Sequence, residues 1–183
     1  MRKPAIPFVR FYLDRVAQPD SHILDIGCGT APYRGLLRGH YTGLDLTAEP
    51  YCEGFPRDVD LVASATAIPL PAASVDLLFS VAVFYQIPDY EAALREFFRV
   101  LRPGGRILLF DYNRRTLRRL GKSDGRTYPC WTQWQLKALL KRHGFKDLEL
   151  LLPNTRPMSA PERALRLIHQ ELFRQWAIVS ATR

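Results

Sequence analysis

Cysteine is scarce in this chain, with three cysteines among 183 residues. Cys28, Cys52 and Cys130 are widely spaced, odd in number and form no Cys-x-x-Cys pair. Zinc knuckles and dithiol redox sites need paired cysteines at short spacing. The sequence therefore argues against both kinds of site, predicts no metal centre, and suits a reduced cytoplasm.

Long apolar runs are also missing. No segment approaches the ~20 consecutive apolar residues that a membrane-spanning helix needs. Pro4, Pro7 and Asp14 interrupt the stretch in which a signal peptide would be continuously apolar. At 47% hydrophobic content, the chain can fill one core and is too short for two ordinary domains. We expect a cytoplasmic protein with one domain over residues 1–183.

Acidic residues are outnumbered, with 18 Asp and Glu against 26 Lys and Arg and a formal net charge of +8. The basic excess lies mostly after residue 95 and is densest from Arg114 to Arg126. Two interpretations of this run stay open: a solvated loop, or a contact with nucleic acid, phosphate or a membrane surface. Charge alone does not identify the partner.

Apolar runs of strand length alternate with helical patterns along the chain. The expected strands are His22–Ile26, Tyr41–Leu46, Val59–Ala63, Val75–Val81, Arg106–Asp111, Phe145–Leu152 and Trp176–Ala181, and the expected helices are Ile6–Val16, Tyr90–Leu101, a segment from Thr132 to Gly144, and Glu162–Phe173. Such alternation predicts an α/β fold with a parallel sheet. Residues 112–131 have no clear period and are too long for a tight connection, which favours a functional loop.

The sharpest motif stands at the end of the first expected strand, in the sequence Asp25-Ile26-Gly27-Cys28-Gly29-Thr30. Its two glycines let the backbone turn tightly and approach a ligand without interference from Cβ. Pro32 follows, and proline suits the first turn of a helix, where its missing N–H costs nothing. We therefore expect a cofactor over this turn, at the carboxyl ends of the strands, and a helix beginning near Pro32.

The acidic residues near this loop discriminate between cofactors. A dinucleotide site needs Gly-x-Gly-x-x-Gly, but Pro32 stands at the third glycine position. Asp25 precedes the first glycine by two residues, where a carboxylate would repel a pyrophosphate and attract a cation. Asp45 ends the second expected strand about twenty residues further on, where an acid accepts hydrogen bonds from ribose hydroxyls. A nucleoside with a cationic tail is therefore favoured over NAD.

Several further motifs follow in order. They are Gly43–Leu46, Ala67–Pro71, Val75–Ser80, Arg99–Ile107 and Leu136–Phe145. With the Asp25–Thr30 loop, this set resembles the class I S-adenosylmethionine-dependent methyltransferases, in a form similar to methyltransferase type 11, over about residues 20–150. The resemblance implies a Rossmann-like fold with a seven-stranded, mostly parallel sheet, an antiparallel last strand and helices on both faces. It also implies S-adenosylmethionine as cofactor and S-adenosylhomocysteine as product.

The resemblance carries roles to single residues. Gly27 and Gly29 would lie beneath the methionyl part of the cofactor, Asp25 would orient that part, and Asp45 would hold the ribose. The implied cofactor contacts are Asp25, Gly27, Cys28, Gly29, Asp45, Leu46, Ser64, Ala65, Thr66, Ser80, Val81 and Tyr85. Cys28 also has a simpler interpretation as a small filler of the loop.

The methyl acceptor must be inferred from the walls of the site. Methyl transfer from a sulfonium is a direct displacement that depends on alignment and exclusion of water, so no catalytic residue is singled out. The basic loop 112–131 is the candidate acceptor-facing lid, and residues 1–20 form a candidate N-terminal helix or lid. The candidate acceptor contacts are Tyr12, Gln86, Arg114, Tyr128 and Trp131.

Three functions remain in view. The favoured one is methyl transfer to a small or lipid-linked metabolite, which would be anionic if the basic loop faces it. An RNA methyltransferase suits the net charge, but no additional nucleic-acid-binding domain is visible. A non-catalytic S-adenosylmethionine-binding partner subunit is the third. It is suggested by Ser64, where the family commonly has Asp, and by Gln86, where many relatives have His.

Overall fold

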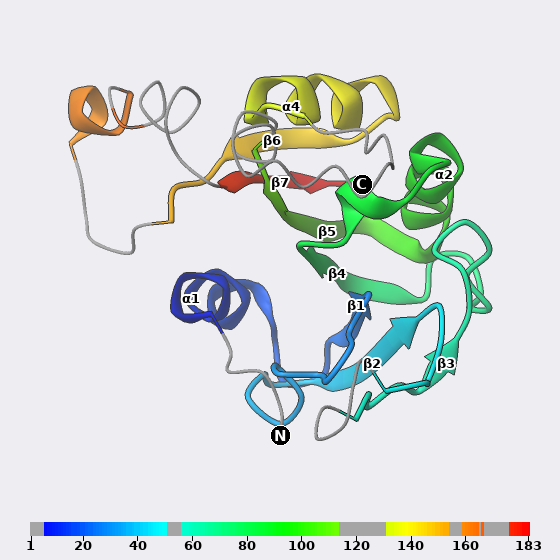
Figure 1. Cartoon of the computed structure of the whole chain (residues 1–183). Coiled ribbons are helices and arrows are strands. Elements are labelled where there is room, and N and C mark those ends of the chain that lie inside the picture. The colour runs from blue at the N-terminus through cyan, green and yellow to red at the C-terminus, as the bar shows by residue number, and fades with distance from the viewer. Residues whose placement is uncertain (1–5, 51–55, 114–130, 154–158, 165, 167–175) are drawn as a thin grey trace.

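One sheet of seven strands organises the chain (Figure 1). The structure, a computed structural model, describes residues 6–50, 56–113, 131–153, 159–164, 166 and 176–183. The strands are β1 (His22–Ile26), β2 (His40–Asp45), β3 (Leu61–Val62), β4 (Val75–Val81), β5 (Leu101–Tyr112), β6 (Lys146–Leu150) and β7 (Trp176–Thr182). Their order in the sheet is β3-β2-β1-β4-β5-β7-β6. The strands from β3 to β5 pair in parallel and β7 is antiparallel to β5 and β6, which confirms the predicted sheet.

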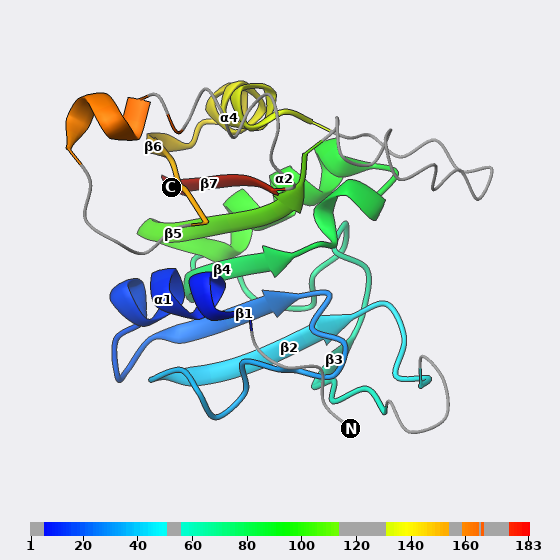
Figure 2. The same cartoon turned by 60° about the vertical axis from the view of Figure 1, so that its left-hand side comes forward.

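Helices pack on both faces of this sheet, as predicted (Figures 1 and 2). On one face, α1 (Pro7–Val16) buries Val9 and Leu13 against the sheet residues Phe79 and Phe110. On the other face, α2 (Tyr90–Val100) and α4 (Gln133–Arg142) share a second apolar cluster. A 3-10 turn, η1 (Phe84–Gln86), follows β4. None of the described helices has the length and apolar character needed to span a bilayer.

The junction of α2 and β5 shows how local sequence sets the element boundaries. The Asp89 side chain caps α2 by accepting a hydrogen bond from the Ala92 N–H at 2.9 Å. Leu101 already has extended backbone, so α2 ends at Val100, one residue before the predicted helix end, and β5 begins at Leu101, five residues before the predicted strand. The early part of β5 contains the turn-forming Pro103–Gly105 stretch, where pairing with β4 changes register.

The segment after β1 differs from the prediction. Residues 32–39 form turns, so the helix expected from Pro32 is absent from this described segment. The backbone has positive φ at Gly35 (+76°) and Gly39 (+110°), which a continuous α-helix cannot accommodate. Gly39 also passes so close to the Ser21 carbonyl oxygen that a Cβ would lie 2.5 Å from it. Tyr33 from this turn, 2% exposed, takes the place of helical side chains by packing edge-on against Phe79.

Further elements depart from the expected bounds, among them the strand expected over Phe145–Leu152, which is found at Lys146–Leu150. The strand expected over Val59–Ala63 is reduced to Leu61–Val62. The helix expected over Glu162–Phe173 is seen as helical residues 160–164, and residues 167–173 lie outside the described part of the chain.

Candidate functional site

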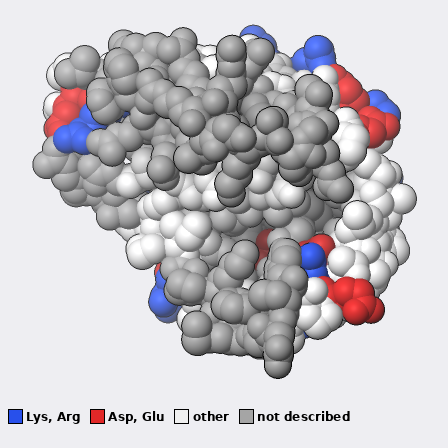
Figure 3. All heavy atoms as spheres, in the orientation of Figure 1, with Lys and Arg blue, Asp and Glu red and all other residues white. Residues whose placement is uncertain are grey.

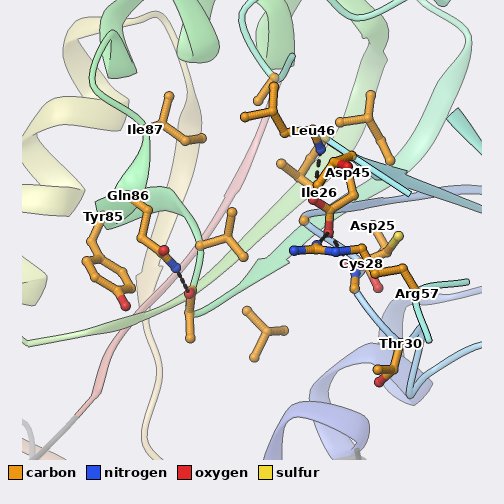
Figure 4. Close-up of a pocket in the computed structure, with 18 of the residues that line it drawn as sticks. Asp25, Ile26, Cys28, Thr30, Asp45, Leu46, Arg57, Tyr85, Gln86 and Ile87 are labelled. Atoms are coloured by element: carbon orange, nitrogen blue, oxygen red, sulfur yellow. Dashed lines mark hydrogen bonds and ion pairs between the residues drawn. The ribbon is translucent and has the colours of Figure 1, made fainter. Parts of the chain in front are cut away.

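A cavity of about 1030 Å³ opens at the carboxyl ends of β1, β2 and β4. Figure 3 shows it as a hollow in which acidic and basic atoms lie close together. Its walls are Ile6, Asp25–Thr30, Pro32, Tyr33, Leu44–Thr47, Arg57, Ala63–Ala65, Val81–Val83, Tyr85–Pro88, Tyr112 and Trp176. Figure 4 shows Asp25, Asp45 and Arg57 on one side and Tyr85, Gln86 and Ile87 on the other. This is the edge at which the sequence predicts the cofactor.

The turn after β1 forms the floor of the cavity. Gly27 has φ +72°, and a Cβ on it would lie 2.4 Å from Cγ2 of Val83. The Gly27 and Cys28 N–H groups both donate to the Leu44 carbonyl oxygen, at 2.7 and 3.1 Å, which ties the turn to β2. Glycine is therefore required at 27 both by backbone conformation and by contact with the opposite wall.

Asp25 is a buried carboxyl, 3% exposed, that lines the cavity. The Tyr41 hydroxyl donates a hydrogen bond to its Oδ2 at 2.6 Å. Burial raises the pKa of Asp25 to about 7, and the Tyr41 hydrogen bond opposes that rise. The Tyr41 ring lies under the Arg34 guanidinium at 4.7 Å, and Arg34 is in turn ion-paired to Asp60. The site thus presents a carboxyl that a bound cation would hold in its ionised form.

Asp45 ends β2 and is 8% exposed. Its Oδ2 accepts hydrogen bonds from the Gly29 N–H at 2.9 Å and from Arg57 at 2.7 Å, and its Oδ1 accepts from the Leu46 N–H at 2.8 Å. Figure 4 shows the Arg57 guanidinium beside Asp45, inside the cavity. The side chain of Arg57 is 12% exposed and its Nε donates to the Glu49 carbonyl oxygen at 2.7 Å. The expected ribose acid therefore has a cationic neighbour that sequence reasoning missed.

The loop after β3 contributes Ser64 and Ala65 to the wall, whereas Thr66 lies outside the lining residues. The Ser64 hydroxyl accepts from the Thr66 N–H at 3.1 Å and lies 2.7 Å from the Thr66 hydroxyl. Ser64 is thus engaged in a local turn. Leu46 lies at the cavity rim with 73% of its surface exposed, an apolar platform of the kind on which a flat nucleobase can pack.

Cys28 lines the cavity but its thiol packs elsewhere. A Cβ on Gly43 would lie 2.8 Å from the Cys28 Sγ, so the sulfur fills the space that this glycine leaves. Burial raises the pKa of the Cys28 thiol to about 12. The side chain is a neutral filler, in agreement with the simpler interpretation above.

The segment after β4 forms the opposite wall. Ala82 has φ +57°, a conformation that residues other than glycine rarely adopt, and its N–H donates to the Phe110 carbonyl oxygen at 2.8 Å. The Gln86 side-chain amide donates to the Ala82 carbonyl oxygen at 2.9 Å. Tyr85 and Gln86 both line the cavity, which places these two predicted residues at the site.

Four predicted site residues lie away from the cavity lining. Thr66 is one, as described above. Ser80 is 1% exposed within β4, so it lies beneath the wall. Tyr12 donates its hydroxyl to the Leu152 carbonyl oxygen at 2.9 Å and packs near Phe110.

Trp131 packs between Phe84 and Tyr90, with ring centroids 5.0 and 4.9 Å away. The structure therefore places the rings of Tyr12 and Trp131 outside the cavity lining, packed against neighbouring aromatic rings. Arg114, Tyr128 and the basic run lie outside the described residues. Among those that are described, no three His, Cys, Asp or Glu side chains come together as metal ligands.

Several lining residues carry no recognisable sequence signal. Besides Arg57, they include Tyr112 at the end of β5 and Trp176 at the start of β7. Because β7 is antiparallel to β5, its first residue lies opposite Tyr112, at the same edge of the sheet as the motif loop. Knowing this strand order would have been enough to predict Tyr112 and Trp176.

Known proteins share both sequence and fold with this chain. Residues 24–109 match a family model described as a methyltransferase domain. The chain is 31% identical over 149 residues to a malonyl-[acyl-carrier protein] O-methyltransferase of Methylococcus capsulatus, covering 72% of this chain and 54% of that protein. It is 32% identical over 108 residues to a demethylmenaquinone methyltransferase of Listeria monocytogenes, covering 51% and 46%. The chain thus spans about half the length of these curated relatives.

The fold has solved counterparts. A SAM-dependent methyltransferase from Archaeoglobus fulgidus superposes with a TM-score of 0.68 at 17% identity, covering 98% of this chain and 95% of that one. This structural similarity establishes the fold of the chain. The cofactor of this family, S-adenosylmethionine, carries an ammonium and a ribose. The buried carboxyl of Asp25, the strand-end carboxylate of Asp45 and the side-chain-free turn at Gly27 fit those groups. Sequence and fold together identify a methyltransferase domain in this chain, with the fold of S-adenosylmethionine-dependent methyltransferases.

Proposed function

We propose that this chain transfers a methyl group from S-adenosylmethionine to a small or lipid-linked metabolite. The observation that carries the proposal is a single cavity that joins the two acids and the glycine turn to an uncharged wall at Tyr85 and Gln86 (Figure 4). The names of the two relatives, which specify malonyl-[acyl-carrier protein] and demethylmenaquinone, support a small or lipid-linked acceptor.

The chemistry requires little from the protein beyond positioning. When bound, S-adenosylmethionine supplies an electrophilic methyl group, whose carbon bonds to the acceptor lone pair while the carbon–sulfur electron pair stays on sulfur. The residues of this chain would orient the two reactants and exclude water. Asp25 would bind the ammonium, and Asp45 the ribose. Val83 lies directly against Gly27, so the donor turn and the acceptor wall fix each other's position.

Arg57 gives this site a feature of its own. Asp45 already accepts hydrogen bonds from two backbone N–H groups, and the Arg57 guanidinium is a third donor to its carboxylate. A ribose that bonds to Asp45 must share the carboxylate with Arg57 or displace it. We therefore propose that Arg57 competes with the nucleoside and lowers its affinity.

The N-terminal segment 1–20 is proposed as a partial lid. Ile6 lines the cavity, and its N–H donates to the Tyr33 hydroxyl at 3.4 Å. Tyr33 is also a lining residue, so this contact places the start of α1 against the donor side of the cavity. Closure by this segment would help to exclude water during transfer.

Transfer of labelled methyl groups tests the proposed function. The protein would be incubated with methyl-labelled S-adenosylmethionine and, separately, with a lipid extract, a small-metabolite fraction and total RNA, using Asp45→Asn as the matched control. We expect label in the lipid or metabolite fraction with the native protein and little with the variant. Label in RNA would instead support the RNA methyltransferase. Binding of cofactor without transfer to any fraction would support the non-catalytic partner subunit.

A further inference from the structure

The two ends of the cavity differ in charge. Among the described lining residues, the charged side chains are Asp25, Asp45 and Arg57, and all three lie at the nucleoside end. The far end, formed by η1 and the adjoining ends of β5 and β7, is lined by apolar and uncharged side chains. An anion placed there would lose its hydration without gaining a cationic partner from these residues. The described wall therefore favours an uncharged molecule.

Aromatic rings from separate elements form a continuous row at this far end. Tyr85 of η1 contacts Tyr112 of β5 edge to face, with centroids 5.6 Å apart and planes at 70°. Tyr112 packs against Trp176 of β7 at 4.9 Å and 31°. Trp176 is backed by Phe8 of α1 at 5.4 Å and 74°. Such offset and edge-on pairs hold each ring in place and leave ring faces and edges for another ring to pack against.

A buried carboxyl lies against the backbone of the first two residues of the row. Asp111 is 2% exposed, accepts a hydrogen bond from the Tyr112 N–H at 3.1 Å, and lies close enough to the Tyr85 backbone for that backbone to lower its pKa. These two residues are distant in sequence, so Asp111 ties the η1 turn to the end of β5. The row is thus positioned by the fold and does not depend on a bound ligand for its arrangement.

Gln86 supplies a polar group beside the row. Its amide nitrogen is engaged with the Ala82 carbonyl oxygen at 2.9 Å, which orients the side chain. The amide oxygen is then the end that can accept a hydrogen bond from a ligand hydroxyl. Figure 4 shows Gln86 beside Tyr85 on the wall that faces the acids.

From these contacts we propose that the far end of the cavity binds the methyl acceptor as a planar, uncharged ring bearing a hydroxyl group. The proposal rests on the methyl-transfer function above and specifies its acceptor class. The ring packs against Tyr85, Tyr112 and Trp176, and its hydroxyl donates to Gln86. The cavity volume of about 1030 Å³ lies at the upper end of the range for ligand pockets, as a ring beside a nucleoside would require.

Matched ring probes test this acceptor class in the native protein. 2-Naphthol is planar and carries a hydroxyl, 2-naphthoate has the same ring with a negative charge, and 1-decanol is apolar without a ring. Each would be titrated calorimetrically with and without saturating S-adenosylhomocysteine. We expect 2-naphthol to bind at least about tenfold more tightly than either of the others. Equal or tighter binding of 2-naphthoate, or equal binding of 1-decanol, would overturn the proposal.

Variants of the row locate the probe. Trp176→Leu and Tyr85→Leu should each weaken 2-naphthol binding at least about fivefold, and Trp176→Leu should leave S-adenosylhomocysteine affinity within about twofold. Tyr85 is half-buried and its ring contacts Tyr112, so this variant is the one expected to fold normally. Trp134→Leu, at an exposed tryptophan of α4 outside the cavity lining, is the matched control. Unchanged 2-naphthol binding in a folded Tyr85→Leu protein would contradict the proposed row.

The same titrations separate the two proposals. Binding of 2-naphthol without any binding of S-adenosylhomocysteine would remove the methyl-transfer function and leave the ring subsite intact. Binding of S-adenosylhomocysteine without 2-naphthol would remove the ring subsite alone.

Discussion

The hydrogen bond from Tyr41 to Asp25 leads to a sharp prediction about pH. Tyr41→Phe removes one hydroxyl and keeps the ring under Arg34. A hydrogen bond to a charged group contributes about 1.5–3 kcal/mol, and one pH unit of pKa change corresponds to about 1.4 kcal/mol. Without this hydrogen bond, the pKa of Asp25, already raised to about 7, should rise by about 1 to 2 pH units.

The consequence for ligand binding can be worked out. A ligand ammonium binds the ionised form of Asp25, and at pH 7 that form is roughly half of the native protein. If the pKa of the variant is about 8.5, its ionised fraction at pH 7 is roughly 3%, and affinity falls by about 15-fold. At pH 9 both carboxyls are mostly ionised, and the difference shrinks to less than about twofold. The loss caused by Tyr41→Phe should therefore disappear as pH rises.

Calorimetric titration with S-adenosylhomocysteine from pH 6 to pH 9 measures this effect. The ligand amine also titrates in this range, but it does so identically for both proteins, so their affinity ratio at each pH isolates Asp25. Tyr12→Phe is the control, because the Tyr12 hydroxyl bonds to the Leu152 carbonyl oxygen away from the cavity. An affinity ratio that stays constant across this pH range would show that Tyr41 acts through packing and would refute the reasoning.

Three further predictions concern stability and affinity. Folding raises the pKa of Asp25 from 3.8 to about 7. The contribution of its neutral carboxyl to the free energy of unfolding is therefore fully present below about pH 4 and is lost as pH rises through 7. Asp25→Asn should therefore be more stable than the native protein by up to about 4 kcal/mol at pH 8 and by much less at pH 4.5, as measured by urea unfolding. Gly27→Ala should destabilise the fold by about 1–3 kcal/mol in thermal unfolding. Adding Val83→Ala to this variant should recover part of that loss, because it removes two of the three Val83 atoms that the new Cβ would meet. Arg57→Ala should raise affinity for S-adenosylhomocysteine by about 3- to 10-fold at low salt, since Asp45 keeps its two backbone N–H partners; a weaker affinity would show that Arg57 clamps the nucleoside.

The fold follows from local patterns over much of the chain. Apolar runs such as Val75–Val81 predicted the strands, and a capped amphipathic stretch predicted α2. The helix expected at Pro32 fails because the turn is set by contacts that local sequence does not reveal. A Cβ on Gly39 would lie 2.5 Å from the carbonyl oxygen of Ser21, which belongs to the loop before β1.

The donor side of the site was predictable and the acceptor side was less so. Asp25 and Asp45 stand at strand ends, and the ends of parallel strands meet at one edge, so residue spacing was sufficient. Arg57 reaches Asp45 through a long connection with no pattern of its own. Trp176 joins the cavity because β7 inserts between β5 and β6, a fact of sheet order and not of the residues around it.

Calorimetric titration of the native protein and of Asp45→Asn with S-adenosylhomocysteine tests the central claim most directly. The predicted result is binding of one ligand per chain to the native protein, weakened by about 1–3 kcal/mol in the variant through loss of hydrogen bonds to a charged group. Absence of heat from the native protein at about millimolar ligand, or equal affinity of the two proteins, would contradict the assignment of this cavity as the cofactor site.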